Sequence, residues 1–205
     1  MAIEQGAVLI SAPLLREETL RYRKVASEDI EAVIAYLRTL APIERDVPPS
    51  EPDFPVNLIM RTMPEKPVLR PVPDKSDAVA YGEYLVTAAS CFDCHTKFDD
   101  GKYIGPPGGG GREFRFPNGA VLRSSNLTPH QTGIVHLSKE DFVRLFKRYA
   151  DPDFQVPVVT PDGFQSLMPW IMYGGMSEED LGAIYEYLRS LPPYEHPVER
   201  FSPGT

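Results

Sequence analysis

Cys91-Phe92-Asp93-Cys94-His95 is the stretch of sequence around which the rest of this chain is interpreted. Its two thiols are three positions apart, and a histidine directly follows the second one. This Cys-x-x-Cys-His pattern is typical of covalent haem attachment, in which each thiol bonds to a haem vinyl group and the histidine ligates the iron. We therefore predict one covalently bound haem c, anchored by Cys91 and Cys94 and ligated by His95.

Three other uses of paired cysteines agree less well with the sequence. A thioredoxin-like redox pair is expected beside a βαβ pattern, whereas the sequence flanking this motif is helical and loop-like. A structural zinc site needs about four ligands, but Cys91 and Cys94 are the only cysteines, and the other histidines stand singly, at His130, His136 and His196. A simple disulfide is the remaining alternative, although it leaves His95 unexplained.

Composition and charge indicate a soluble globular protein. Of the 205 residues, 42% are hydrophobic and 24% are charged, which is ordinary for such proteins. The net charge is −8 and no basic stripe is visible, which argues against nucleic acid as a partner. The acidic balance suits redox partner proteins with a basic docking face. The 22 prolines indicate long, rigid connections.

Covalent haem attachment indicates a periplasmic protein, or one on the periplasmic face of a membrane. No apolar run reaches the roughly 18–20 residues that cross a bilayer. The apolar stretch at residues 7–10 is too short to serve as a signal peptide, and Glu4 stands where a basic flank is expected. We expect that the export signal is not present in this chain.

Four helices are predicted from hydrophobic periodicity and capping residues. The first runs from Ser27, its candidate N-cap, to residue 40, and the second from Asp77 to Ser90. The other two run onward from the capping serines Ser138 and Ser177. The proline-rich tract between the first two predicts an extended connector, with a short helical turn at residues 57–60.

The sequence that follows the haem motif predicts loops and one hairpin. The glycine-rich run 105–111 lacks the Gly-Lys-Ser/Thr ending of a phosphate-binding loop. We interpret it as backbone that passes closely by the haem edge. Phe114, Phe116, Val121 and Leu122 flank Pro117-Asn118-Gly119, and because Asn-Gly is a strong turn signal, this segment predicts a hairpin.

The first and last predicted helices repeat each other at an offset of 151 residues. Residues 28–40 and 179–191 share Tyr-Leu-Arg and Ser/Thr-Leu in one register. Periodicity alone does not fix such identities, so we predict a common origin. The N-terminal region is then the closing helix of an earlier haem domain that lacks its own haem motif. At the offset of 151, the position that corresponds to Met168 is occupied by Glu17, so the N-terminal region is not expected to hold haem in the same way.

A second axial ligand is expected downstream of His95. Met168 lies 73 residues later and is followed by Pro169. A thioether is a soft ligand, and histidine/methionine coordination raises the reduction potential of a haem. Methionine more often fills a core, and Met172 and Met176 compete with Met168. Spacing alone does not choose among the three.

Several stretches of the second half resemble class I c-type cytochromes, particularly the multi-haem cytochrome c subunits of membrane-associated alcohol and aldehyde dehydrogenases. Besides the haem motif, they are Tyr81-Gly82-Glu83-Tyr84-Leu85, Ser125-Asn126-Leu127-Thr128-Pro129, Thr132-Gly133-Ile134, Met168-Pro169-Trp170 and residues 177–193. The chain departs from these relatives in having one haem motif where they have two or three, and in His136, where they tend to carry another residue.

The resemblance implies roles for individual residues. Cys91 and Cys94 become the thioether anchors, His95 the proximal ligand and Met168 the distal one. Further implied roles are a close helix crossing at Gly82 near Tyr187 and Leu188, a carbonyl of Gly105-Pro106 that accepts a hydrogen bond from the His95 ring, and contacts of Arg112 and Trp170 with the haem propionates.

We thus expect a mostly α fold in three parts. Residues 1–45 are a helical remnant of a haem-less cytochrome repeat, residues 46–75 a proline-rich connector, and residues 76–205 a class I cytochrome c domain with one haem.

The expected function is one-electron transfer by a low-spin His/Met haem. The electrons pass from a dehydrogenase or quinol-oxidising partner toward a terminal acceptor, as in a respiratory chain. On this interpretation the chain is an electron carrier rather than an enzyme, with at most the role of a subunit in an oxidoreductase complex. The alternatives are a peroxidase-like or gas-binding haem protein with an open sixth position, and a docking subunit of a larger redox complex.

Overall fold

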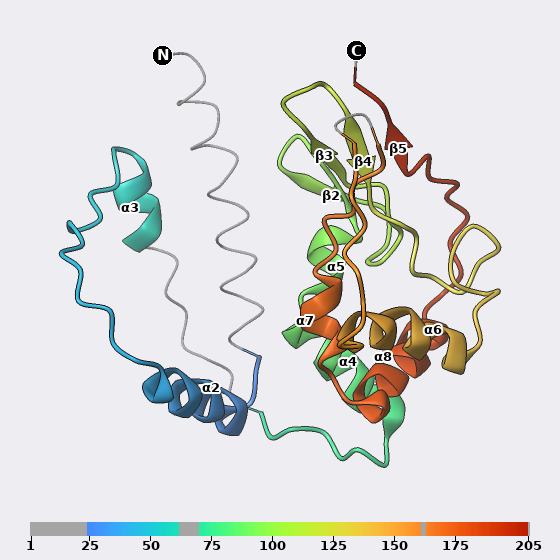
Figure 1. Cartoon of the computed structure of the whole chain (residues 1–205), viewed down its shortest axis with the longest axis horizontal. Coiled ribbons are helices and arrows are strands. Elements are labelled where there is room, and N and C mark those ends of the chain that lie inside the picture. The colour runs from blue at the N-terminus through green and yellow to red at the C-terminus, as the bar shows by residue number, and fades with distance from the viewer. Residues whose placement is uncertain (1–23, 62–69, 161–162, 205) are drawn as a thin grey trace. The chain divides into compact units, whose positions relative to one another are not determined.

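The computed structural model describes residues 24–61, 70–160 and 163–204. The chain divides into two compact units, Met1–Val72 and Pro73–Thr205, and each is described separately below (Figure 1). Among the described residues, no helix combines the length and the apolar character needed to cross a membrane.

The described part of the first unit contains two helices, α2 (Ser27–Thr39) and α3 (Val56–Arg61). The helical turn expected at residues 57–60 is confirmed by α3. Ser27 was expected to cap α2, and this is wrong: the N-cap is Ala26, and Ser27 is the first helical residue. The Ser27 hydroxyl lies 3.4 Å from the Glu28 carboxylate. Ser27 stands one position inside the helix, whereas the extended backbone typical of an N-cap is found at Ala26, whose side chain has no group that can accept a hydrogen bond.

Part of the predicted proline-rich connector lies outside the described residues, at 62–69, and the described residues 46–55 contain neither helix nor strand. The origin of residues 1–45 as a cytochrome remnant stays a prediction.

The second unit contains the helices that surround the haem motif. They are α4 (Ala78–Ala88), α5 (Cys91–Cys94), α6 (Lys139–Lys147) with the short 3₁₀ helix η1 (Arg148–Ala150), α7 (Trp170–Gly174) and α8 (Glu178–Ser190). The capping predictions for α6 and α8 are confirmed, and α4 has a capping side chain that was not predicted. Side-chain oxygens of Asp77, Ser138 and Ser177 accept hydrogen bonds from backbone N–H groups in the first turns of α4, α6 and α8. The sequence did not predict α7.

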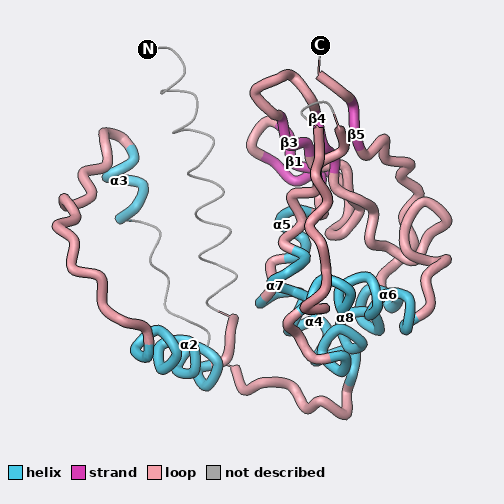
Figure 2. The backbone as a smooth tube through the Cα atoms, viewed as in Figure 1, coloured by secondary structure: helices cyan, strands magenta, loops and turns pink. Residues whose placement is uncertain are grey.

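Two small antiparallel sheets complete the second unit (Figure 2). The first is the hairpin of β1 (Lys97–Asp99) and β2 (Lys102–Ile104). The second has the order β3 (Glu113–Arg115), β4 (Val121–Arg123) and β5 (Phe201–Ser202). Phe114 faces Leu122 across the β3–β4 pair, which confirms the predicted hairpin, and Gly119 in its turn has φ +82°. The β1–β2 hairpin stands where only loop was expected.

The crossing of α4 and α8 forms one wall of the core. A Cβ atom added to Gly82 would lie 2.0 Å from the Ala183 carbonyl oxygen and 2.8 Å from the Tyr187 Cβ. The close crossing expected at Gly82 is therefore confirmed, and it involves Ala183 as well as Tyr187. Beside it, the Tyr81 hydroxyl donates to the Asp180 carboxylate at 2.8 Å. The buried core residues are Val86, Ile134, Phe142, Phe146, Leu181, Ile184 and Leu188.

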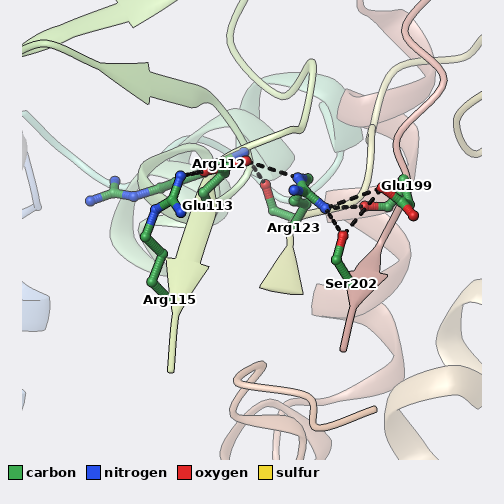
Figure 3. Close-up of polar contacts among 7 residues, drawn as sticks. Arg112, Glu113, Arg115, Arg123, Glu199 and Ser202 are labelled. Carbon is green, nitrogen blue, oxygen red and sulfur yellow. Dashed lines mark hydrogen bonds and ion pairs between the residues drawn. The ribbon is translucent and has the colours of Figure 1, made fainter. Parts of the chain in front are cut away.

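A polar network joins the C-terminal strand to the hairpin (Figure 3). Arg123 in β4 bonds through Nε to the Glu113 carboxylate at 3.0 Å and through its terminal nitrogen to the Ser202 hydroxyl at 2.8 Å. The same nitrogen lies 3.2 Å from the Glu199 carbonyl oxygen. One arginine thus connects all three strands.

Candidate haem-attachment site

Helix α5 places the two cysteines of the haem motif one turn apart. Residues at i and i+3 lie on the same side of a helix, so Cys91 and Cys94, the first and last residues of α5, project to one side. Both are free thiols rather than a disulfide; Cys91 is partly buried and Cys94 exposed. Burial raises the pKa of Cys91 to about 12, and the neighbouring Cys94 acts in the same direction.

His95 follows α5 directly and is fixed by a backbone carbonyl. Its Nδ1 lies 2.8 Å from the Ser125 carbonyl oxygen. Because a carbonyl can only accept a hydrogen bond, Nδ1 carries the proton, and Nε2 keeps a lone pair available to a metal. Burial lowers the pKa of His95; the bond to Ser125 opposes this shift, and the charge of Arg200 adds to it. The ring is thereby held in the neutral form that ligates metals.

The partner of His95 differs from the one expected. The resemblance implied a carbonyl in Gly105-Pro106, and this is wrong, since the Ser125 carbonyl occupies that role. A backbone acceptor has no side-chain signature, so residue types did not reveal it. The available signal was position, because Ser125 opens the Ser-Asn-Leu-Thr-Pro run that the resemblance had already singled out.

Asn126 holds the segment that carries the Ser125 carbonyl. Its side chain is 2% exposed, and its Oδ1 accepts from the Thr128 backbone N–H at 2.9 Å and hydroxyl at 2.8 Å. Its Nδ2 donates to the Thr132 hydroxyl at 3.1 Å and to the Tyr194 carbonyl oxygen at 2.8 Å. The amide thus joins this loop to the C-terminal segment, directly beside the group that orients His95.

The glycine-rich run packs between the haem motif and the Asn126 segment. The Gly110 N–H donates to the His95 carbonyl at 2.7 Å. Gly110 has φ +75°, and an added Cβ would lie 2.5 Å from the Asn126 backbone nitrogen. The Thr96 hydroxyl, on a side chain that is 3% exposed, accepts from the Gly108 N–H at 3.2 Å. Only glycine allows this close approach together with a positive φ.

Arg112 is fixed against the haem motif. Its guanidinium donates to the Asp93 carbonyl, between the two cysteines. The same group lies 5.3 Å from the ring centre of Phe98 and 5.8 Å from that of Phe114, within the range of a cation–π contact. Its proximity to the motif agrees with the expected neighbourhood of the haem, while a role toward a propionate stays a prediction.

Met168 lies in a turn that Ser166 and Trp170 stabilise. The Ser166 hydroxyl accepts from the Met168 N–H at 3.3 Å and from the Trp170 indole N–H at 2.9 Å. The indole is stacked on Tyr149, with ring centres 5.2 Å apart and an angle of 11° between the planes. Met168 and Cys91 both pack against the same buried core. The predicted distal ligand and one predicted anchor thus contact the same hydrophobic core.

The two competing methionines differ from each other in burial. Met172 is 79% exposed, so its thioether lies in solvent. Met176 packs against the core like Met168, and its carbonyl accepts from the Lys147 ammonium at 3.0 Å. Burial thus argues against Met172 and leaves Met176 as the competitor of Met168.

The zinc alternative finds no further ligands in the part of the chain that the structure describes. There, no group of three or more His, Cys, Asp or Glu side chains is arranged to hold a metal ion. The donor set that is present, two unpaired thiols followed by a neutral histidine with a free Nε2, fits covalently attached haem.

Comparison with curated proteins gives three relatives. The chain is 29% identical over 149 residues to the fructose dehydrogenase cytochrome subunit of Gluconobacter japonicus, covering 71% of the chain and 27% of the relative. It is 32% identical over 110 residues to the gluconate 2-dehydrogenase cytochrome c subunit of Pantoea cypripedii, covering 53% and 22%. It is 30% identical over 107 residues to the alcohol dehydrogenase (quinone) cytochrome c subunit of Gluconobacter oxydans, covering 52% and 20%. No family model matches the chain.

The chain resembles the cytochrome c subunits of dehydrogenases. This confirms the resemblance that the sequence motifs indicated, and a helix-rich unit with small sheets agrees with it. The matched stretches span only 20–27% of the relatives' own lengths.

Proposed function

We propose that this chain is a one-electron carrier with a single, covalently attached haem c. Cys91 and Cys94 form the thioether bonds, His95 ligates the iron through Nε2, and Met168 ligates it from the other side. When bound, the haem supplies a reversible ferric/ferrous couple. The observation that carries the proposal is His95, whose Nδ1 is held by the Ser125 carbonyl directly after two unpaired thiols.

The protein's part in this function is to orient and tune the ligands. The Ser125 carbonyl fixes the His95 ring and makes Nε2 a stronger donor, as hydrogen-bonded partners do for ligating histidines. Asn126 holds the Ser125 segment in place. The Met168 thioether favours the ferrous state and raises the reduction potential. Electron transfer needs no acid–base side chain, so we assign no catalytic residue.

The relatives suggest where the electrons come from. All three are cytochrome subunits of dehydrogenases, which supports a dehydrogenase as the electron donor. We further propose a quinol-oxidising protein as the alternative donor, a terminal acceptor for the electrons, and a location on the periplasmic side of a membrane, where c-type haem is attached. Because the net charge is −8, we propose that the docking face of the redox partner is basic.

Absorption spectra of the haem-loaded chain test this proposal. The full chain is produced with an added export signal and a haem-attachment system. We expect haem that survives denaturation, a low-spin spectrum, and the long-wavelength ferric band of a methionine ligand. Met168→Ala should remove that band, whereas the matched variants Met172→Ala and Met176→Ala should retain it.

Three results would count against the assignment. Loss of the band in Met176→Ala alone would make Met176 the ligand. A high-spin spectrum with ready binding of cyanide or carbon monoxide would favour the peroxidase-like or gas-binding alternative. Absence of covalent haem would show that Cys91 and Cys94 are not haem anchors.

A further inference from the structure

Helix α2 exposes the apolar side of an amphipathic helix. Ile30 is 36%, Val33 57% and Leu37 56% exposed. A helix of this kind is stabilised by burying its apolar face. Helix α8, which repeats its sequence at an offset of 151, shows which neighbours such a helix takes.

The repeat extends to backbone and side-chain geometry. Both helices are 13 residues long. At their C-termini, the Thr39 hydroxyl donates to the Tyr36 carbonyl and the Ser190 hydroxyl to the Tyr187 carbonyl, each at 2.7 Å. The next leucine N–H in each helix bonds to the carbonyl three residues earlier. The two helices therefore end in the same way, and their faces can be compared position by position.

The face of α8 that packs on α4 includes Asp180, Ala183 and Tyr187. Asp180 accepts from the Tyr81 hydroxyl, while Ala183 and Tyr187 form the surface on which Gly82 rests. The corresponding residues of α2 are identical, and they are Asp29, Ala32 and Tyr36. The buried Leu181, Ile184 and Leu188 correspond to Ile30, Val33 and Leu37, which keep the apolar character of this face.

The other face of α8 contacts α6 and the segment before it. An added Cβ on Gly182 would lie 2.7 Å from the Lys139 side chain, and Glu186 pairs with Lys139 at 3.1 Å. Tyr185 donates to the Leu137 carbonyl and packs on Phe142. All three α8 residues are replaced in α2, by Glu31, Ile34 and Ala35. Helix α2 thus keeps the surface for an α4-type helix and lacks the one for α6.

We propose that α2 binds the N-terminal helix of a second cytochrome c domain. That helix carries, as α4 does, a Tyr-Gly pair at the crossing. The glycine rests on Ala32 and Tyr36, the tyrosine hydroxyl reaches Asp29, and apolar flanks cover Ile30, Val33 and Leu37. The α4 of this chain packs on α8 and is not the occupant. This surface goes beyond electron transfer and does not depend on how the haem is ligated.

A peptide that copies α4 serves as the probe. It spans residues 75–90 and is stapled between positions 79 and 83, both exposed in α4, because an isolated helix of this length is marginal in water. It is titrated into the ¹⁵N-labelled full-length chain with haem attached. We expect saturable shifts of the α2 amide signals, and at least tenfold weaker binding by the same peptide with Gly82→Leu.

Two variants of the chain locate the surface. Ala32→Leu fills the position on which the glycine rests and should weaken peptide binding at least tenfold. Ala35→Leu, on the side that corresponds to the α6 contact, is the matched control and should bind the peptide like the unmodified chain.

Three outcomes would overturn the proposal. They are the absence of saturable α2 shifts, equal binding of the Gly82→Leu peptide, and equal loss of binding in Ala32→Leu and Ala35→Leu.

Sedimentation of the full chain tests the identity of the occupant. If the full chain sediments as a dimer and the Ala32→Leu variant as a monomer, the occupant of this face is a second copy of the chain, and the proposal is also overturned. Haem spectra report on the electron-carrier function and α2 amide shifts on this surface, so either can fail alone.

Discussion

Asn126 links the orientation of His95 to the stability of the second unit. Its buried amide makes four hydrogen bonds, and truncation leaves their partners unsatisfied. We expect Asn126→Ala to lower the free energy of unfolding by about 2–4 kcal/mol, measured by urea denaturation. Asn57→Ala, at an exposed position of α3, is the control and should change it by less than about 0.5 kcal/mol. Equal effects would show that the amide does not hold this loop.

Asp180 makes part of the stability dependent on pH. Burial alone would raise the pKa of its carboxyl, but hydrogen bonds from Ser177 and Tyr81 and the charge of Lys75 together lower it below the ordinary value. The unfolded chain therefore takes up this proton at higher pH than the folded one, so the contribution is present above the unfolded pKa of 3.8 and is lost as the pH falls through the folded pKa.

Asp180→Asn should accordingly reduce stability near neutral pH and flatten its decline between about pH 5 and 3. Thermal unfolding followed across this range is the measurement. Asp99→Asn, an exposed position in β1, is the control. An unchanged slope in Asp180→Asn would contradict the assignment.

At the level of residues, the sequence predicted the parts of the site that have side-chain signatures. The cysteine spacing and the following histidine identify the motif, and they lie on α5 and directly after it. The Ser125 carbonyl and the contact of Arg112 with the Asp93 carbonyl were missed, because backbone acceptors can belong to any residue type. The choice between Met168 and Met176 depends on packing, which spacing does not encode.

Among the helices and strands, the α4–α8 crossing is the contact most sensitive to a single atom. The methyl carbon of an alanine at position 82 would lie 2.0 Å from the Ala183 carbonyl oxygen. Because this distance is far too short, the two helices would have to move apart. We expect Gly82→Ala to cost about 3 kcal/mol of folding free energy, at the upper end of overpacking effects. Chemical denaturation of the haem-loaded chain measures this. Gly175→Ala is the control, because its nearest neighbour, the Met172 carbonyl, is 3.3 Å away, and a similar loss there would refute the argument.

Helices with a capping side chain and a periodic apolar face were predictable. Asp77, Ser138 and Ser177 mark the starts of α4, α6 and α8. The short elements were not predictable, because β1, β2 and α7 are three to five residues long and show no full period. Strand β5 pairs with β4 about eighty residues earlier in sequence, and local patterns carry no information on such a distant partner.

For the whole molecule, the core residues that the structure describes in the second unit form one buried cluster. Its buried members run from Val86 to Leu188, and the boundary between the units falls after Val72. The repeat between α2 and α8 gives the first unit a different role in our interpretation: it supplies a helix face to another cytochrome domain. The haem unit and the docking helix are then separate functions of one chain.

The net charge of −8 gives the whole molecule a long-range field that would act on the proposed redox partner. With a basic partner, attraction speeds encounter, and salt screens it as the Debye length falls from about 30 Å at 0.01 M to about 8 Å at 0.15 M ionic strength. We expect the electron-transfer rate to a basic c-type cytochrome to fall severalfold over this range in stopped-flow experiments. Reduction by a small uncharged reductant is the control and should not change. A rate to the basic cytochrome that is equally independent of salt would show that the acidic surface does not guide docking.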